Sequence, residues 1–88
     1  MKSTTTDYTE RVFGYLQQMA AAQGVALPPE TESLFGSGVL DSFGLLEFVE
    51  FIEEELNIQI PDDDLLAGNF ETVAKIRVYI SERMEGQA

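Results

Sequence analysis

The sequence contains no cysteine and no histidine. Without them the chain cannot form a disulfide, a zinc site of the usual ligand type, or a Ser-His or Cys-His nucleophilic pair. The most common catalytic arrangements are therefore excluded, and we do not expect an enzyme. Its apolar runs are only a few residues long, and no basic, apolar leader opens the chain, so we expect neither a membrane span nor a signal peptide. The cytosol is the default compartment, and a cytoplasmic protein is expected.

Basic residues are also scarce. Five Lys and Arg stand against 16 Asp and Glu, which gives a formal net charge of -11. This charge repels phosphate backbones and anionic lipid heads, so nucleic acid and membranes are not expected partners. Proteins with basic patches are better candidates, because electrostatic steering would speed their association with the chain. The total charge alone does not exclude a second explanation, in which it only keeps the protein soluble.

The length of the chain limits the size of its core. With 88 residues and 44% hydrophobic content, we expect one domain spanning residues 1–88. A domain of this size buries only about 60% of the surface of its unfolded chain, which is too little to enclose a deep active site. The size therefore favours a module over a stand-alone enzyme. We expect this module to be a monomer.

The spacing of the apolar residues is helical along most of the chain. It predicts helices at about residues 7–23, 42–56, 62–68 and 71–84. Residues 1–6 are polar and expected to fray, and Gly24 is a suitable C-cap for the first helix. Pro28 and Pro29 begin a long connection with a glycine-containing loop at 34–40. The predicted fold is all-α, a small bundle of three main helices and one short helix.

Ser42 is the candidate functional residue. It opens the second predicted helix after the glycine-containing loop, so its hydroxyl should be exposed. The unpaired N–H groups at a helix N-terminus favour an attached phosphate. The structural alternative is that Ser42 is an ordinary N-cap, a common role for serine.

The second helix also carries an acidic stripe. On a helical wheel its apolar residues point to one side, and the acidic residues begin on the side of Ser42. Two large apolar residues fall inside the acidic stripe. The predicted docking residues are Phe43, Leu46, Glu47, Glu50, Glu53 and Glu54. Exposed apolar groups ringed by charge are typical of protein-docking surfaces, although a solvated acidic face with both apolar residues tucked into loops is the alternative.

The distribution of charge favours docking. The segment from Asp41 to Asp64 has nine acidic residues and no Lys or Arg, and all five basic residues lie outside residues 12–74. Surfaces that serve only solubility usually mix both signs. The carboxylates do not fit a calcium loop, because an EF-hand starting at Asp62 would place Ala67 at the glycine position and Val73 at the bidentate glutamate position. No metal site is expected.

Three segments together resemble the acyl and peptidyl carrier proteins, a phosphopantetheine-binding family. They are Gly38-Val39-Leu40-Asp41-Ser42-Phe43, Ile58-Gln59-Ile60-Pro61-Asp62 and Asn69-Phe70-Glu71-Thr72-Val73. The resemblance implies an acyl-carrier-like helical bundle with 4'-phosphopantetheine on Ser42, next to Asp41. A phosphopantetheinyl transferase would attach the arm from coenzyme A. A ligase or adenylation enzyme would load it as a thioester, and downstream acyl-processing enzymes would use the cargo. The alternative is an unmodified acidic subunit with a docking or regulatory role.

Two departures from the family pattern bear on the cargo. The residue after the modified serine is usually Leu or Met in these carriers, and here it is Phe43. The segment between Pro61 and Thr72 is longer than in the typical fatty-acid carrier. Phe43 with Gly44 looks closer to free-standing D-alanyl and peptidyl carriers. We therefore expect an aminoacyl or specialised acyl cargo.

Overall fold

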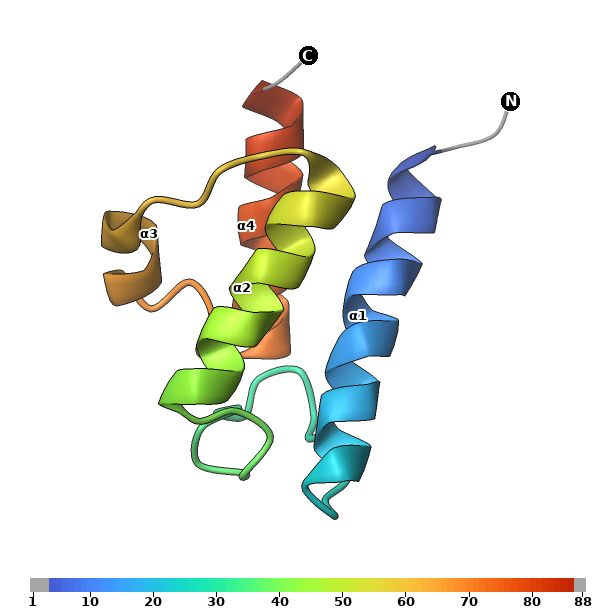
Figure 1. Ribbon diagram of the computed structural model, residues 1–88, viewed down its shortest axis with the longest axis vertical. Helices are drawn as coiled ribbons and strands as arrows, with labels where there is room; N and C mark the ends of the chain where they lie inside the picture. Colours follow the sequence, from blue (N-terminus) through green and yellow to red (C-terminus); the bar gives the residue numbers. More distant parts are fainter. Residues whose placement is uncertain (1–3, 87–88) are drawn as a thin grey trace.

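The computed structural model describes residues 4–86, which form an all-α bundle (Figure 1). Its helices are α1 (Thr4–Ala22), α2 (Ser42–Leu56), α3 (Asp62–Leu66) and α4 (Val73–Gly86). The predicted fold class is confirmed. The first helix begins at Thr4 rather than at residue 7, and the rest of the segment expected to fray lies outside the described residues. The last helix begins at Val73 rather than at residue 71.

Two main helices end where the sequence indicated. After α1, Gly24 has a φ of 77° and the Val25 N–H donates to the Ala20 carbonyl at 3.0 Å. Asn57 ends α2 in the left-handed region, with φ 56° and ψ 48°. The short helix α3 ends at Leu66, earlier than predicted. Gly and Asn are favoured at such ends because they adopt positive φ at little steric cost.

The core lies between α1, α2 and α4 and is completed by residues from the connections. Its fully buried members include Val12 and Leu16 of α1, Phe48 and Ile52 of α2, and Ile76 of α4. The connections contribute further buried apolar side chains. These are Leu34, Val39, Leu40, Ile58, Ile60 and Phe70. Because a chain this short has few residues to spare, its loops are part of the core.

The long connection before α2 is tied to the start of α4. The Leu34 N–H donates to the Glu71 carbonyl at 2.7 Å, and the Ala74 N–H donates to the Glu30 carbonyl at 3.0 Å. The Leu34 carbonyl accepts from the Val39 and Leu40 N–H groups, which closes the loop. The segment that leads into α2 is therefore fixed by both apolar burial and backbone hydrogen bonds.

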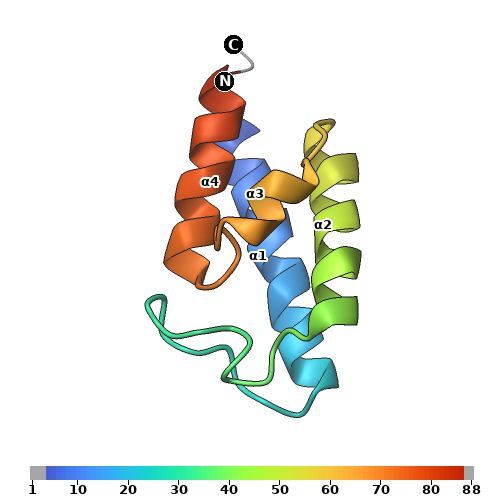
Figure 2. The ribbon, with the colours of Figure 1, turned by 90° about the vertical axis from the view of Figure 1, so that its left-hand side faces the viewer.

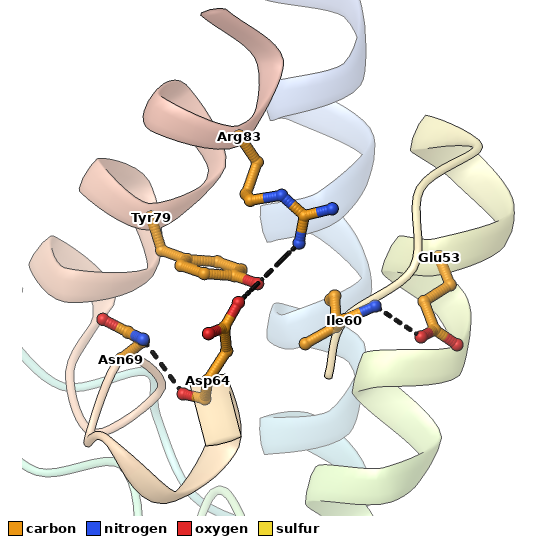
Figure 3. Close-up of polar contacts among 6 residues, drawn as sticks. All are labelled: Glu53, Ile60, Asp64, Asn69, Tyr79 and Arg83. Atoms are coloured by element: carbon orange, nitrogen blue, oxygen red, sulfur yellow. Dashed lines mark hydrogen bonds and ion pairs between the residues drawn. The ribbon is translucent and has the colours of Figure 1, made fainter. Parts of the chain in front are cut away.

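The short helix α3 lies between α2 and α4 (Figure 2). A polar network attaches it to α4 (Figure 3). The Tyr79 hydroxyl donates to Asp64 Oδ2 at 2.5 Å and accepts from Arg83 Nη1 at 2.8 Å. Burial raises the pKa of Tyr79 above its usual value of 10.0; the hydrogen bond to Asp64 adds to this rise, and Arg83 opposes it. Tyr79 therefore stays a neutral hydrogen-bond donor at physiological pH.

Adjacent residues of the connection offer a test of its role in the core. Leu34 is 0% exposed, whereas Phe35 beside it is 41% exposed. Leu34→Ala should lower the free energy of unfolding by about 2 to 5 kcal/mol, because it leaves a cavity in the core. Phe35→Ala should lower it by less than about 1 kcal/mol. Urea unfolding followed by circular dichroism measures both losses. A loss below about 1 kcal/mol for Leu34→Ala would show that the connection is not part of the core.

Candidate functional site

The start of α2 separates the helix cap from the candidate serine. Asp41 has an extended backbone (φ -122°, ψ -173°), and its Oδ1 accepts from the Gly44 N–H at 2.7 Å. The Asp41 carbonyl accepts the first helical bond, from the Leu45 N–H at 2.8 Å. Asp41 is therefore the N-cap, and the alternative in which Ser42 is an ordinary N-cap is wrong. Ser42 is the first helical residue, and its side chain is exposed.

The first turn of α2 suits a phosphate on the Ser42 hydroxyl. The Ser42 and Phe43 N–H groups precede the first intrahelical bond, and such groups attract anions. None of the residues of this turn is acidic, and the neighbouring Asp41 carboxylate is engaged by the Gly44 N–H. The residues present therefore fit the group that the resemblance implies. The structure gives Asp41 the role of holding the helix end, and direct contact of Asp41 with a cofactor stays a prediction.

Gly44 lets the cap lie close to α1. It is buried, and a Cβ at this position would lie 3.2 Å from Asp41 Oδ1 and 3.3 Å from Met19 Cε. A larger residue would push against both the capping carboxylate and the neighbouring helix. Gly44 thus supports the geometry that leaves Ser42 at the surface.

Most of the predicted docking residues are exposed on α2. Phe43 is 70% exposed and Leu46 is 55% exposed, so neither is tucked into a loop. Glu47, Glu50 and Glu54 are exposed as well. We call these five residues the α2 docking surface; its use by a partner stays a prediction.

Glu53 differs from the other predicted docking residues. It is half-buried, and its Oε2 accepts from the Ile60 N–H at 2.8 Å (Figure 3). This bond holds the connection between α2 and α3 against the helix. Glu53 is therefore less exposed than the other predicted docking residues, and one of its carboxylate oxygens binds a backbone group of its own chain. Its use in docking stays a prediction.

Ion pairing leaves the α2 docking surface negatively charged. Each basic side chain of residues 4–86 pairs with a carboxylate. The pairs are Arg11–Glu55, Lys75–Glu71, Arg77–Glu30 and Arg83–Asp64. None of these pairs includes Glu47, Glu50 or Glu54. Within the described part of the chain, the three glutamates thus lack a basic partner.

Helix α1 also contributes to this face of the molecule. Glu47, Glu50 and Glu54 line a hollow of about 210 Å³ together with Tyr15 and Phe51. The Tyr15 and Phe51 rings stack with centroids 4.1 Å apart. The prediction from the sequence did not include Tyr15, because its helical spacing is that of an ordinary core residue.

A second hollow is apolar and lies beside α2. We call it the α2–α3 groove; it has a volume of about 330 Å³. Its lining residues are Phe35, Leu45, Leu65, Leu66, Gly68, Phe70 and Glu71. Leu66 is 85% exposed, and no pattern in the sequence predicts this exposure. A helix of five residues is too short to show which side its apolar residues face.

The described residues contain neither a cluster of metal ligands nor a membrane-spanning helix. Among residues 4–86, no group of three or more acidic side chains is arranged to hold a metal ion. Within the same range, no helix combines the length and apolar character needed to cross a bilayer.

A comparison with known protein families finds a match over most of the chain. The family model described as "Phosphopantetheine attachment site" matches residues 15–79. The chain belongs to this family. Its cofactor is 4'-phosphopantetheine, which is attached covalently. The match covers α2 and α3 in full and supports the expectation of a carrier rather than an enzyme.

Similar curated proteins are carriers of two kinds. An acyl carrier protein of Clostridium perfringens is 42% identical over 45 residues, which cover 51% of this chain and 57% of that protein. A D-alanyl carrier protein of Streptococcus pyogenes is 40% identical over 51 residues, which cover 58% of this chain and 65% of that protein. The matched region thus spans less than two thirds of either relative. No solved structure gives a significant match.

The division of roles between Asp41 and Ser42 can be measured as stability. Asp41→Ala should lower the free energy of unfolding by about 1 kcal/mol, because it removes the cap. Asp41→Asn should retain most of the wild-type free energy of unfolding, since asparagine also caps well. Ser42→Ala should change it by less than about 0.5 kcal/mol. The measurement is urea unfolding of the unmodified variants. A larger loss of stability for Ser42→Ala than for Asp41→Ala would show that Ser42, rather than Asp41, caps α2.

Proposed function

We propose that this chain tethers an acyl or aminoacyl group as a thioester on 4'-phosphopantetheine attached to Ser42, and presents that group to partner enzymes. The observation that supports this most directly is the separation of roles at the start of α2. Asp41 makes the capping hydrogen bond, while Ser42 is exposed in the first turn. A hydroxyl that is not used by the cap, at a helix end that favours phosphate, suits covalent modification.

Attachment would rely on a catalytic base from the partner, since the chain offers neither a Ser-His nor a Cys-His pair. A phosphopantetheinyl transferase would remove the Ser42 proton as the new Oγ–phosphorus bond forms. The pyrophosphate bond of coenzyme A breaks, and its nucleotide half leaves. The arm supplies the thiol that this chain lacks. The part played by the chain is to hold Ser42 in place and accessible, which raises the effective concentration of the cargo at each partner.

The α2 docking surface is the proposed contact for these partners. Its exposed Phe43 and Leu46 offer apolar area to a partner, and the unpaired Glu47, Glu50 and Glu54 orient it. A partner with basic side chains is therefore the complement. The expected partners are the transferase, a ligase or adenylation enzyme, and downstream acyl-processing enzymes, each bound by a monomeric carrier. A small, charge-guided contact allows rapid exchange between them.

For the cargo, we propose an aminoacyl or specialised acyl group. Phe43 and Gly44 support this choice, because this pair resembles free-standing D-alanyl and peptidyl carriers. The α2–α3 groove is open and only about 330 Å³ in volume. This is near the lower end of the roughly 300 to 1,000 Å³ typical of ligand pockets. A cargo of modest size fits the groove without separating the helices.

The attachment site is tested by intact mass. We expect the unmodified protein to gain the mass of phosphopantetheine when incubated with coenzyme A and a broad-specificity phosphopantetheinyl transferase. Fragmentation should locate the adduct on Ser42, and Ser42→Ala should gain nothing while keeping its helical circular dichroism. A folded wild-type protein that stays unmodified would favour the unmodified docking or regulatory subunit instead.

The docking surface is tested by matched charge reversals. Changing both Glu47 and Glu50 to Lys should lower kcat/KM of the transferase about tenfold at low salt, because steering is lost. The control changes Glu82 and Glu85, which are also exposed and equally spaced, on α4. The difference between the two double variants should shrink as salt rises, because salt screens exposed charges. Equal effects of both double variants would argue against a localised docking surface.

A further inference from the structure

Helix α3 has little apolar burial to hold it in place. It consists of five residues, Asp62–Leu66, and none of them is buried. Leu66 is 85% exposed, and no residue from 61 to 69 is buried, whereas Ile60 and Phe70 on either side are 7% and 1% exposed. Leu65 is partly buried and packs against the core, and it is the one apolar side chain of α3 that does so. Beyond this single contact, the position of α3 depends on polar contacts.

Those contacts converge on Asp64. Its Oδ2 accepts from the Tyr79 hydroxyl at 2.5 Å and lies 3.8 Å from Arg83 Nη1. Its backbone carbonyl accepts from Asn69 Nδ2 at 2.9 Å (Figure 3). One residue of α3 thus joins α3 both to α4 and to the segment that follows α3. We call the Asp64, Tyr79 and Arg83 side chains the α3 latch.

The Tyr79 side of the latch is rigid. Tyr79 is 6% exposed, and its ring packs against Phe70 with centroids 5.3 Å apart. Arg83 also donates to the Tyr79 hydroxyl at 2.8 Å, which orients the hydroxyl to donate to Asp64. The hydroxyl is therefore a fixed point on α4 against which α3 is positioned.

On the Asp64 side of the latch, neighbouring carboxylates repel one another. Asp62, Asp63 and Asp64 are consecutive, and like charges this close repel one another. In the part of the chain that the structure describes, Arg83 is the basic side chain that pairs with this triplet. The latch thus offsets a repulsion that would otherwise favour a looser α3.

The position of α3 also determines the shape of the α2–α3 groove. Leu65 and Leu66 of α3 line the groove, and Leu45 of α2 lines it too. Figure 2 shows α3 placed between α2 and α4, so a shift of α3 moves these leucines relative to α2. The width of the groove therefore depends on the contact between Asp64 and Tyr79.

We propose that Tyr79 is a positioning residue for the cargo: its hydroxyl, acting through Asp64, fixes α3 and so limits the size of the acyl group that the α2–α3 groove shelters. Release of the latch lets the segment between Ile60 and Phe70 move outward while both anchors stay in the core. The cargo part of this proposal rests on the proposed function, whereas the control of α3 by Tyr79 does not.

The first test uses the unmodified protein and needs no cofactor. In Tyr79→Phe, amides of residues 62–69 that are protected in the wild type should exchange hydrogen about tenfold faster, which corresponds to the loss of one hydrogen bond to a charged group. Amides of Leu16 and Ile52 should be unchanged. Tyr15→Phe is the matched control, because it also removes one hydroxyl and keeps the stack on Phe51. Unchanged exchange at 62–69, or equal acceleration throughout the chain, would overturn the latch.

A second pair of variants acts on the half-exposed Asp64 and leaves the core intact. Asp64→Ala should accelerate exchange at residues 62–69 at least as much as Tyr79→Phe. Asp64→Asn keeps an oxygen that accepts from the Tyr79 hydroxyl and should restore part of the protection. If Asp64→Asn and Asp64→Ala behave alike, the hydrogen bond from Tyr79 is not what holds α3.

The cargo part is tested on holo protein loaded with butyryl or decanoyl groups. The readout is the rate at which hydroxylamine cleaves the thioester. In the wild type the longer chain should extend beyond the groove. Tyr79→Phe should let α3 move outward, so that the groove shelters more of the decanoyl chain. Cleavage of the decanoyl thioester should then slow several-fold, while cleavage of the butyryl thioester should be unchanged. If the two chains respond alike, α3 does not limit the cargo, whatever the exchange experiment shows. Failure to load the arm at all would instead contradict the attachment site and leave the exchange result standing.

Discussion

The hydrogen bond from the Gly44 N–H to Asp41 Oδ1, at 2.7 Å, fixes where α2 begins. Once the first residue of a helix is fixed, the 3.6-residue period fixes the direction of every later side chain. Phe48 and Ile52 then point into the core, while Leu46 and Glu50 point to solvent. The same bond assigns the cap to Asp41 and leaves the Ser42 hydroxyl at the surface. Core packing, the α2 docking surface and the candidate attachment site thus depend on one capped turn.

The ion pairs make the distribution of negative charge over the surface uneven. Arg11 pairs with Glu55 on the side of α2 that meets α1, and Arg77 pairs with Glu30 in the long connection. Exposed pairs of this kind add little stability. Their larger effect is on the distribution of charge: among the described residues, Glu55 is the α2 carboxylate that pairs with a basic side chain, and Glu47 and Glu50 on the exposed side of α2 have no such partner. The helix that carries Ser42 therefore keeps a negatively charged face.

The sequence predicted the parts of the fold that follow from the helical spacing of its apolar residues and from local end signals. The three main helices, the stop at Asn57 and the exposure of Ser42 all follow from local patterns. The bond from Tyr79 to Asp64 joins residues 15 apart, and neither residue has a pattern that indicates the other. The role of Glu53 was missed for a related reason: a helical wheel shows its direction but not the Ile60 backbone that turns back to meet it. Such polar contacts depend on the path of the connection, which propensity does not determine.

A weakly held α3 between firmly held neighbours also has a thermodynamic consequence. Ile60 and Phe70 are buried, and Glu53 binds the Ile60 N–H, so both ends of the segment stay on the core when the latch opens. Opening then costs only the contacts of the segment itself, and proteins commonly open such segments without global unfolding. The core of α1, α2 and α4 keeps Ser42 in place during this local opening. In the proposed function, a chain of 88 residues would in this way combine a fixed candidate attachment residue, Ser42, with an adjustable groove, because different contacts hold each of them.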